Sequence, residues 1–277
     1  MKKLLAKALP LAYGQYFNVY SLLMPKKAAH KAFNLFCTVR KGKVQQAEYL
    51  DKNKNGVEFA ANHKIQTYHW PGAKETVLLV HGWESNTFRW RNLIKKLQEA
   101  NFNIVAFDAP SHGYSSGELL YVPLYEEVVH FMVKKYNPKY AIGHSVGGMT
   151  LMYNEHKNPN PGVEKLVTIG SPSEFYEIMD HFQQILKFNN RFMSVLNDYI
   201  YNRFGFQIRE FSTSKFAASN TKMGLLFHDK LDIVAPYHAS EQVHTNWKGS
   251  KLVSTEGLGH SMHQEEINNQ IIEFLEA

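Results

Sequence analysis

Tyr140-Ala141-Ile142-Gly143-His144-Ser145-Val146-Gly147-Gly148 is the stretch that decides the fold of this chain. Its first three residues are a short apolar run that is typical of a buried strand, and a helix-like segment continues from Val146 to Tyr153. The pattern Gly-x-Ser-x-Gly is weak by itself, because chance would produce it in roughly one chain in fifteen. Between a strand and a helix, however, it predicts a very sharp turn that points the Ser145 hydroxyl into open space.

The segments on both sides of this stretch alternate between short apolar runs and helix-like runs. We expect strands at 77–80, 103–107, 139–143, 165–170, 223–228 and 252–254, after an opening pair within 47–72 whose turn lies at 53–56. Helices are expected at 1–40, 88–100, 124–136, 146–153 and 265–275. Continuous apolar strands that alternate with helices predict an α/β fold, with a mostly parallel sheet and helices on both faces. The 277 residues are enough for one large domain of this kind.

Residues 171–222 break the alternation, because they contain no good strand. Apolar residues follow helical spacing from Phe175 to Leu186 and again from Phe192 to Ile200. Eleven of these 52 residues are aromatic, about 21% against 13% for the whole chain, so the segment must bury an apolar face against something. Long excursions from a compact domain are often lids, and we therefore expect a helical cap here. A plain helical pair packed on the body is compatible with this interpretation.

The positive charge of the chain is concentrated near its N-terminus. Nine Lys or Arg and no Asp or Glu lie in residues 1–47, which leaves 22 basic against 25 acidic residues in the rest. We expect residues 1–46 to form a basic helical extension. Its apolar face would pack on the protein itself, and the alternative is peripheral contact with anionic membrane lipid. The residues that could form this face are Leu4, Leu5, Leu9, Leu11, Phe17, Tyr20, Leu22 and Leu23.

Composition narrows the class of protein further. Lys7 interrupts the first apolar run and no clear small-residue cleavage site follows, so we do not interpret the start as a signal peptide. No apolar run is long enough to span a bilayer. The single cysteine, Cys37, cannot form an internal disulfide and is expected to be a small apolar residue on a helix. We expect a cytoplasmic protein with no nucleic-acid partner, because no recognition motif accompanies the basic charge. The oligomeric state is not predicted.

A serine nucleophile needs a base within hydrogen-bond reach, and the base needs an acid that orients it. On a turn of this kind, nucleophile, acid and base follow one another along the chain. Asp232 lies in the polar loop after the strand at 223–228 and just before an apolar turn, which suits an inward-pointing carboxylate. Asp229 is the alternative acid, although Asp is also a common turn residue.

The candidate base is His260, in the loop after the last expected strand. Gly257 and Gly259 precede it and give the backbone freedom to place the ring over Ser145. His263 is the alternative base. The other histidines are expected to be surface or structural residues, and among them His81 and His112 lie in loops that face the site. A further requirement is an oxyanion hole, for which we nominate the backbone amides of Val146 and Trp83.

Several of these stretches, taken in order, resemble the landmarks of the α/β-hydrolase superfamily. They are His81-Gly82-Trp83, Phe107-Asp108-Ala109-Pro110-Ser111-His112-Gly113-Tyr114-Ser115, Gly143 to Gly148, His228 to Pro236 and Gly257 to His260. The resemblance covers roughly residues 64–277 and is greatest to the carboxylesterase and lysophospholipase-like branch with a helical cap. It implies an eight-stranded, mostly parallel sheet in a hydrolase domain at 47–277, with the cap at about 171–222.

Two details refine this resemblance. Ser111 stands where many relatives carry glycine, but it is a loop position and puts no catalytic residue in doubt. The serine nucleophile argues against dehalogenases and epoxide hydrolases, which use aspartate at that position.

The expected reaction is two-step acyl transfer without a metal or organic cofactor. Ser145 would attack a carbonyl with His260 as base and Asp232 as the orienting acid, and water would then release the acyl group. The aromatic cap favours a carboxylic ester of a small or medium apolar acyl or aryl group as the small-molecule substrate. Thioesters, amides, lactones and carbon–carbon bonds are alternatives on the same scaffold. A non-catalytic binding module is the alternative from a different class.

Overall fold

The computed structural model describes residues 2–40 and 47–277, and only the backbone of residues 2–8. Its helices and strands form two compact units. Unit 1 consists of Met1–Thr38 and Glu174–Ser212, and unit 2 of Val39–Ser173 and Thr213–Ala277. The side chains of Leu4 and Leu5, which we expected on the apolar face, lie outside the described residues. Lys41 and Lys43 of the basic segment lie outside them as well.

Unit 2 is built on an eight-stranded sheet in the order β1-β2-β4-β3-β5-β6-β7-β8. The strands are β1 Lys54–Ala60, β2 His63–Trp70, β3 Thr76–Val80, β4 Asn103–Phe107, β5 Tyr140–His144, β6 Lys165–Ile169, β7 Met223–Asp229 and β8 Ser250–Thr255. β2 runs antiparallel to both of its neighbours, and every other pair is parallel. The predicted mostly parallel eight-stranded sheet is therefore confirmed.

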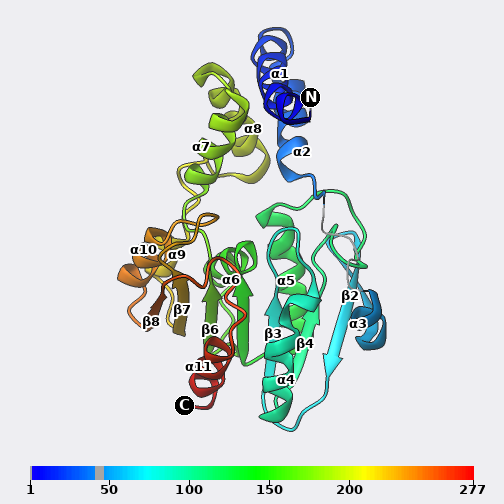
Figure 1. Cartoon of the computed structure of the whole chain (residues 1–277), viewed down its shortest axis with the longest axis vertical. Helices are drawn as coiled ribbons and strands as arrows, with labels where there is room; N and C mark the ends of the chain where they lie inside the picture. Colours follow the sequence, from blue (N-terminus) through cyan, green and yellow to red (C-terminus); the bar gives the residue numbers. More distant parts are fainter. Residues whose placement is uncertain (1, 41–46) are drawn as a thin grey trace. The chain divides into compact units, whose positions relative to one another are not determined.

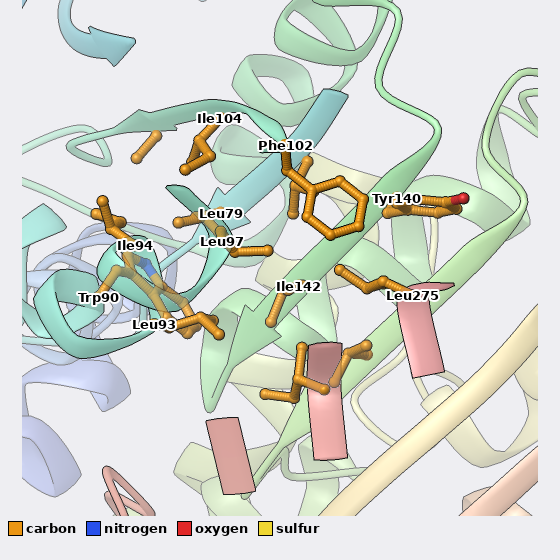
Figure 2. Close-up of a cluster of buried hydrophobic side chains, with 14 of the residues drawn as sticks. Leu79, Trp90, Leu93, Ile94, Leu97, Phe102, Ile104, Tyr140, Ile142 and Leu275 are labelled. Carbon is orange, nitrogen blue, oxygen red and sulfur yellow. The ribbon is translucent and has the colours of Figure 1, made fainter. Parts of the chain in front are cut away.

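Helices cover both faces of this sheet (Figure 1). α4 (Arg91–Glu99) and α11 (Glu265–Glu276) lie on one face, and α5 (Val122–Tyr136), α6 (Val146–Lys157), α9 (Thr213–Ala217) and α10 (His238–Asn246) on the other. Successive residues of a strand point to opposite faces. Leu79 accordingly packs in the first layer and Leu78 in the second. Figure 2 shows part of the first layer, where Leu79, Ile104 and Ile142 of the strands meet Trp90, Leu93, Ile94 and Leu97.

The start of unit 2 differs in part from the prediction. Two antiparallel strands form as expected, but residues 47–53 are the helix α3 (Ala47–Asn53), and β1 begins at Lys54 where we expected a turn. The turn lies instead at Ala61 and Asn62, whose φ angles of 48° and 61° are the left-handed pair of a tight two-residue hairpin. Glu48 and Lys52 face each other one helical turn apart, which favours the helix over a strand.

The helix expected at 88–100 is also divided. It begins as a short 3₁₀ turn, η1 (Thr87–Trp90), and continues as α4. Asn86 caps η1 by accepting a hydrogen bond from the Phe88 amide. Among the described helices, none is long and apolar enough to cross a membrane.

Unit 1 contains four helices, α1 (Lys2–Leu23), α2 (Pro25–Cys37), α7 (Phe175–Leu186) and α8 (Asn190–Phe204). Its core is aromatic: the Phe17 ring stacks on Phe192 with centroids 5.7 Å apart and meets Phe188 edge-on at 5.8 Å. The Asn18 amide adds two hydrogen bonds, to the carbonyl of Lys187 and from the amide of Asn189. The N-terminal helices and the inserted helices therefore share one core.

This grouping differs from the boundaries that we expected. The described part of residues 1–46 does not form a separate extension, because the buried face of α1 packs on the inserted helices. The inserted part of unit 1 is 174–212 rather than 171–222, because α9 packs in unit 2 beside α6 and α10. Cys37 is fully buried on α2, as expected, and burial raises the pKa of its thiol.

Candidate active site

Ser145 occupies a strained turn between β5, which ends at His144, and α6, which begins at Val146. Its φ of 52° and ψ of −125° are a conformation that a residue with a side chain rarely adopts. The Ser145 amide donates to the carbonyl of Ile169 on the neighbouring strand β6, with an N···O distance of 2.8 Å. The predicted sharp turn is therefore present, and it places Ser145 at the carboxyl ends of the parallel strands.

The glycines of this turn are required by close approach of the backbone. A Cβ at Gly147 would overlap the carbonyl oxygen of Val80 on β3, and one at Gly143 would lie 2.6 Å from the Cα of Gly148. Both distances are below any that real Cβ atoms tolerate. Only glycine lets α6 start this close to the sheet.

His260 and Asp232 form a hydrogen-bonded pair. His260 Nδ1 and Asp232 Oδ2 are 2.7 Å apart, and the Asp232 side chain is fully buried. The other carboxylate oxygen, Oδ1, accepts the amides of Val234 and Ala235 at 2.8 and 3.1 Å. These two bonds hold the carboxylate in one orientation, so its free oxygen faces the imidazole.

Asp229, the alternative acid, binds other groups. Its carboxylate accepts the Thr255 hydroxyl at 2.8 Å and the amides of Leu231, Leu258 and Gly257. Burial would raise the pKa of this carboxyl, but the hydrogen bonds together hold it below its usual value. Asp229 therefore connects the loop after β7 to the loop that carries His260, and its carboxylate does not bind the imidazole.

Two other histidines lie near this pair. His228 is fully buried under Asp232, with Nε2 at 3.5 Å from Asp232 Oδ2 and 3.0 Å from the carbonyl of Ala235. His263, the alternative base, is half-buried, and burial together with Arg89 and Arg91 lowers its pKa to about 4. A histidine with that pKa is neutral at pH 7, but its weak basicity makes it a poor proton acceptor there.

Ser145 and His260 both lie against the end of β6. The Ser145 amide binds Ile169, and a Cβ at the next residue, Gly170, would lie 3.2 Å from His260 Nδ1. In the described part of the chain, no hydrogen bond joins the Ser145 hydroxyl to the imidazole. Catalytic hydrogen bonds are often long without substrate and shorten only in the complex. Both residues thus lie beside the end of β6, with no hydrogen bond between their side chains in the described residues.

The loop after β3 lies directly against Ser145. A Cβ at Gly82 would be 2.9 Å from the Cβ of Ser145, so the chain there passes as close to the serine as backbone can. Two residues after Gly82, the amide of Glu84 donates to His112 Nε2 at 3.0 Å. This bond fixes the peptide that joins Trp83 to Glu84. Because α6 begins at Val146, the Val146 amide has no partner within the helix.

His81 and His112 are structural residues, as expected. His81 Nδ1 donates to the carbonyl of Gly82, and its Nε2 accepts the Ala109 amide at 2.9 Å. His112 binds in the same way, donating to Pro110 and accepting from Glu84. Burial lowers the pKa of His81 to about 4 and that of His112 to about 3, so both rings are neutral near pH 7.

Two residues that we did not assign from the sequence support the His260 loop. His144 Nε2 donates to the His260 carbonyl at 3.0 Å, and Arg89 donates to the carbonyl of Ser261 at 2.8 Å. Both side chains are buried, and burial lowers the pKa of Arg89 to about 9 and keeps that of His144 well below its usual value. The contacts join residues 116 and 172 positions apart, so sequence spacing offers no signal for them.

Known proteins resemble this chain over different lengths. A family model for the alpha/beta hydrolase fold matches residues 75–199. The pimeloyl-[acyl-carrier protein] methyl ester esterase of Vibrio vulnificus is 33% identical over 113 residues, which are 39% of this chain and 42% of that enzyme. The (R)-3-hydroxydecanoyl-ACP:CoA transacylase of Pseudomonas aeruginosa is 22% identical over 246 residues, 74% of this chain and 81% of the transacylase. The match to the Vibrio esterase thus spans about two fifths of its length.

Solved structures resemble the chain more completely. An esterase from Exiguobacterium antarcticum superposes with a TM-score of 0.64 at 16% identity, covering 80% of this chain and all of that one. Est1E from Butyrivibrio proteoclasticus, solved with ferulic acid bound, gives 0.66 at 18% identity, covering 80% of this chain and 98% of Est1E. At this identity the likeness establishes the fold.

Proposed function

Since this chain belongs to the α/β-hydrolase superfamily, we propose that it is a serine hydrolase of the esterase type with Ser145 as its nucleophile. The observation that carries the proposal is the pairing of a strained serine turn with a His260–Asp232 hydrogen bond at the same end of the sheet. A turn of this kind exposes the serine hydroxyl, so a substrate can approach it without meeting neighbouring side chains.

Acylation begins when Ser145 Oγ attacks a substrate carbonyl carbon and His260 Nε2 accepts the hydroxyl proton. Asp232 holds Nδ1 protonated, which leaves Nε2 as the basic nitrogen, and it stabilises the imidazolium that forms. The amides of Trp83 and Val146 bind the developing oxyanion. The positive end of α6 favours the same charge, because Val146 is the first residue of that helix.

The intermediate collapses when His260 Nε2–H protonates the leaving oxygen, and the alcohol departs. Water then enters, loses a proton to His260 and attacks the acyl carbon. The second oxyanion collapses with return of the proton to Ser145 Oγ, which releases a carboxylic acid. No step requires a group beyond the side chains and amides already named.

The substrate that we propose is a carboxylic ester of a small or medium apolar acyl or aryl group. The name of the Vibrio relative describes hydrolysis of a methyl ester. Est1E, which shares the fold, was solved with an aromatic acid bound. A second candidate is acyl transfer from a thioester. It is favoured by the transacylase, whose similarity covers most of both chains. The same serine would attack the thioester carbonyl, with a thiol as the leaving group.

The test is hydrolysis of p-nitrophenyl esters from acetate to laurate, together with acyl-CoA thioesters, by the wild type and Ser145→Ala. We expect ester turnover that falls by roughly 10⁴-fold or more in the variant, because no other group can form the acyl-enzyme. Ser219→Ala, which removes an exposed hydroxyl bound only to the carbonyl of Phe216, is the matched control and should keep full activity. Activity that survives in Ser145→Ala would overturn the assignment of the nucleophile.

A further inference from the structure

α1 packs one face in the core of unit 1 and leaves an apolar face exposed. The buried side chains are Phe17, Asn18 and Ser21, which recur at helical spacing. On the opposite side Leu9, Tyr16, Val19 and Leu23 also follow helical spacing, and they are exposed by 58%, 45%, 60% and 79%. We call these four residues the outer stripe. Residues 8–25 contain no charged side chain, so the stripe is not interrupted.

An apolar outer stripe is unusual for a surface helix, whose outward face is normally polar or charged. A helix that is apolar all round is usually buried, but the outer stripe faces away from the core of unit 1. Crossing a bilayer is no explanation either, because among the described helices none is long and apolar enough. A helix with an exposed apolar face and basic neighbours fits the plane of a membrane surface.

The charged residues of the N-terminal segment that carries the outer stripe are all positive. Lys26, Lys27 and Lys31 are exposed on the first turns of α2, immediately after α1. The Lys31 ammonium lies 3.3 Å from the Tyr16 hydroxyl and 5.2 Å from the centre of the Tyr20 ring, so one lysine is held directly beside the stripe. No Asp or Glu occurs in residues 1–47 to offset these charges. Tyrosine and lysine together are typical of the headgroup level of a bilayer.

We propose that α1 lies in the surface of an anionic lipid membrane. The outer stripe would enter the boundary between headgroups and acyl chains, while Lys26, Lys27 and Lys31 contact the anionic headgroups. A second copy of this chain is a poorer occupant, since a symmetric pair would place two basic segments together with no Asp or Glu in residues 1–47 to offset them. The inference concerns unit 1 alone and goes beyond the proposed hydrolase activity.

The experiment is co-sedimentation of the full chain with vesicles of phosphatidylcholine alone or mixed with phosphatidylglycerol. We expect binding that requires phosphatidylglycerol and weakens as salt is raised. Val19→Glu should reduce the fraction bound by roughly tenfold or more, because it inserts a charge into the apolar boundary. Val57→Glu is the matched control: Val57 is 61% exposed on β1, against 60% for Val19, and its substitution should leave binding unchanged.

A second variant tests the charges separately. Lys26→Glu with Lys27→Glu should reduce binding to the mixed vesicles roughly tenfold or more and reduce its salt dependence. Equal binding to both kinds of vesicle, or equal binding by Val19→Glu and Val57→Glu, would overturn the proposal. So would a wild-type dimer that Val19→Glu converts to a monomer with no vesicle binding, since a second copy would then cover the stripe. Circular dichroism and ester hydrolysis should be unchanged in all three variants, which separates this test from that of Ser145.

Discussion

Asp229, the last residue of β7, and Asp232, in the loop that follows, are three residues apart, yet their carboxylates bind different groups. Asp232 contacts the His260 imidazole, whereas Asp229 binds a hydroxyl and three backbone amides. An orienting acid must touch the base, because its effect is to fix the tautomer and stabilise the imidazolium. The pair therefore offers a matched test of the proposed triad within one short segment of the chain.

We predict that Asp232→Asn lowers kcat by roughly 10³- to 10⁴-fold with little change in KM, because an amide can hold His260 in the wrong tautomer. Asp229→Asn should keep kcat within about tenfold. It should instead lower the free energy of unfolding by about 1–3 kcal/mol, because buried donors lose a charged acceptor. Steady-state kinetics and urea unfolding of both variants check these values. A larger loss of kcat in Asp229→Asn than in Asp232→Asn would contradict the assignment.

At the scale of elements, the junction of β5 and α6 depends on how closely the helix approaches β3. The Gly147 Cα faces the Val80 carbonyl, and the space for a methyl group there is already occupied by backbone. Backbone atoms cannot rotate away as a flexible side chain can. A substitution at this position must therefore shift the helix or the strand.

We predict that Gly147→Ala lowers the free energy of unfolding by about 3 kcal/mol or more and reduces kcat by moving Ser145. Gly205→Ala is the comparison. Gly205 ends α8 with a φ of 79°, but a Cβ there would meet no atom within 4 Å, so the cost is only the backbone strain of about 1 kcal/mol. Thermal unfolding of the two variants measures the difference. Equal melting temperatures for the two variants would contradict the expected overlap between a Cβ at Gly147 and the Val80 carbonyl.

Unit 1 shows, at the same scale, how two segments far apart in the sequence pack together in one core. α1 and α2 leave an apolar face, and so do α7 and α8, and the rings of Phe17, Phe188 and Phe192 close both faces together. Neither pair of helices could bury its apolar side chains alone. The high aromatic content of the insertion is thus explained by a shared core with the N-terminal helices.

At the scale of the whole molecule, several buried histidines couple stability to pH. The folded state keeps His81 neutral, with a pKa of about 4, while an unfolded chain protonates the same ring near pH 6.5. Between these two values the unfolded state therefore binds more protons than the folded state. Stability does not depend on this group above pH 6.5, and it falls as the pH drops toward 4. Burial lowers the pKa of His112 and His144 in the same direction.

We predict a loss of stability between pH 6.5 and 4 to which His81 alone contributes about 3 kcal/mol. Urea unfolding at a series of pH values measures the slope. His81→Gln, which retains a donor and an acceptor, should flatten this slope, whereas the exposed His181→Gln should leave it unchanged. If His81→Gln has the wild-type slope, burial of this ring does not drive the acid sensitivity.

The features that the sequence by itself determined are local ones. Continuous apolar runs predicted six parallel strands to within one or two residues at most ends, because a strand covered on both faces has few polar side chains. The sharp turn at Ser145 followed from glycines at fixed offsets between a strand-like and a helix-like run, since that spacing is itself a local signal. Where local signals competed, as at 47–56, the prediction failed: the polar stretch 53–56 resembled a turn, but the hairpin formed at Ala61 and Asn62.

Only the tertiary structure decided which side chains meet. The sequence left Asp229 and Asp232 open, because both belong to the same polar stretch, and the choice depends on where a loop 28 residues away places His260. The contacts of His144 and Arg89 with that loop, and the shared core of the N-terminal and inserted helices, are likewise long-range. Such contacts are set by the packing of whole elements. No local pattern encodes that packing, because many pairings of apolar faces satisfy the same hydrophobic periodicity.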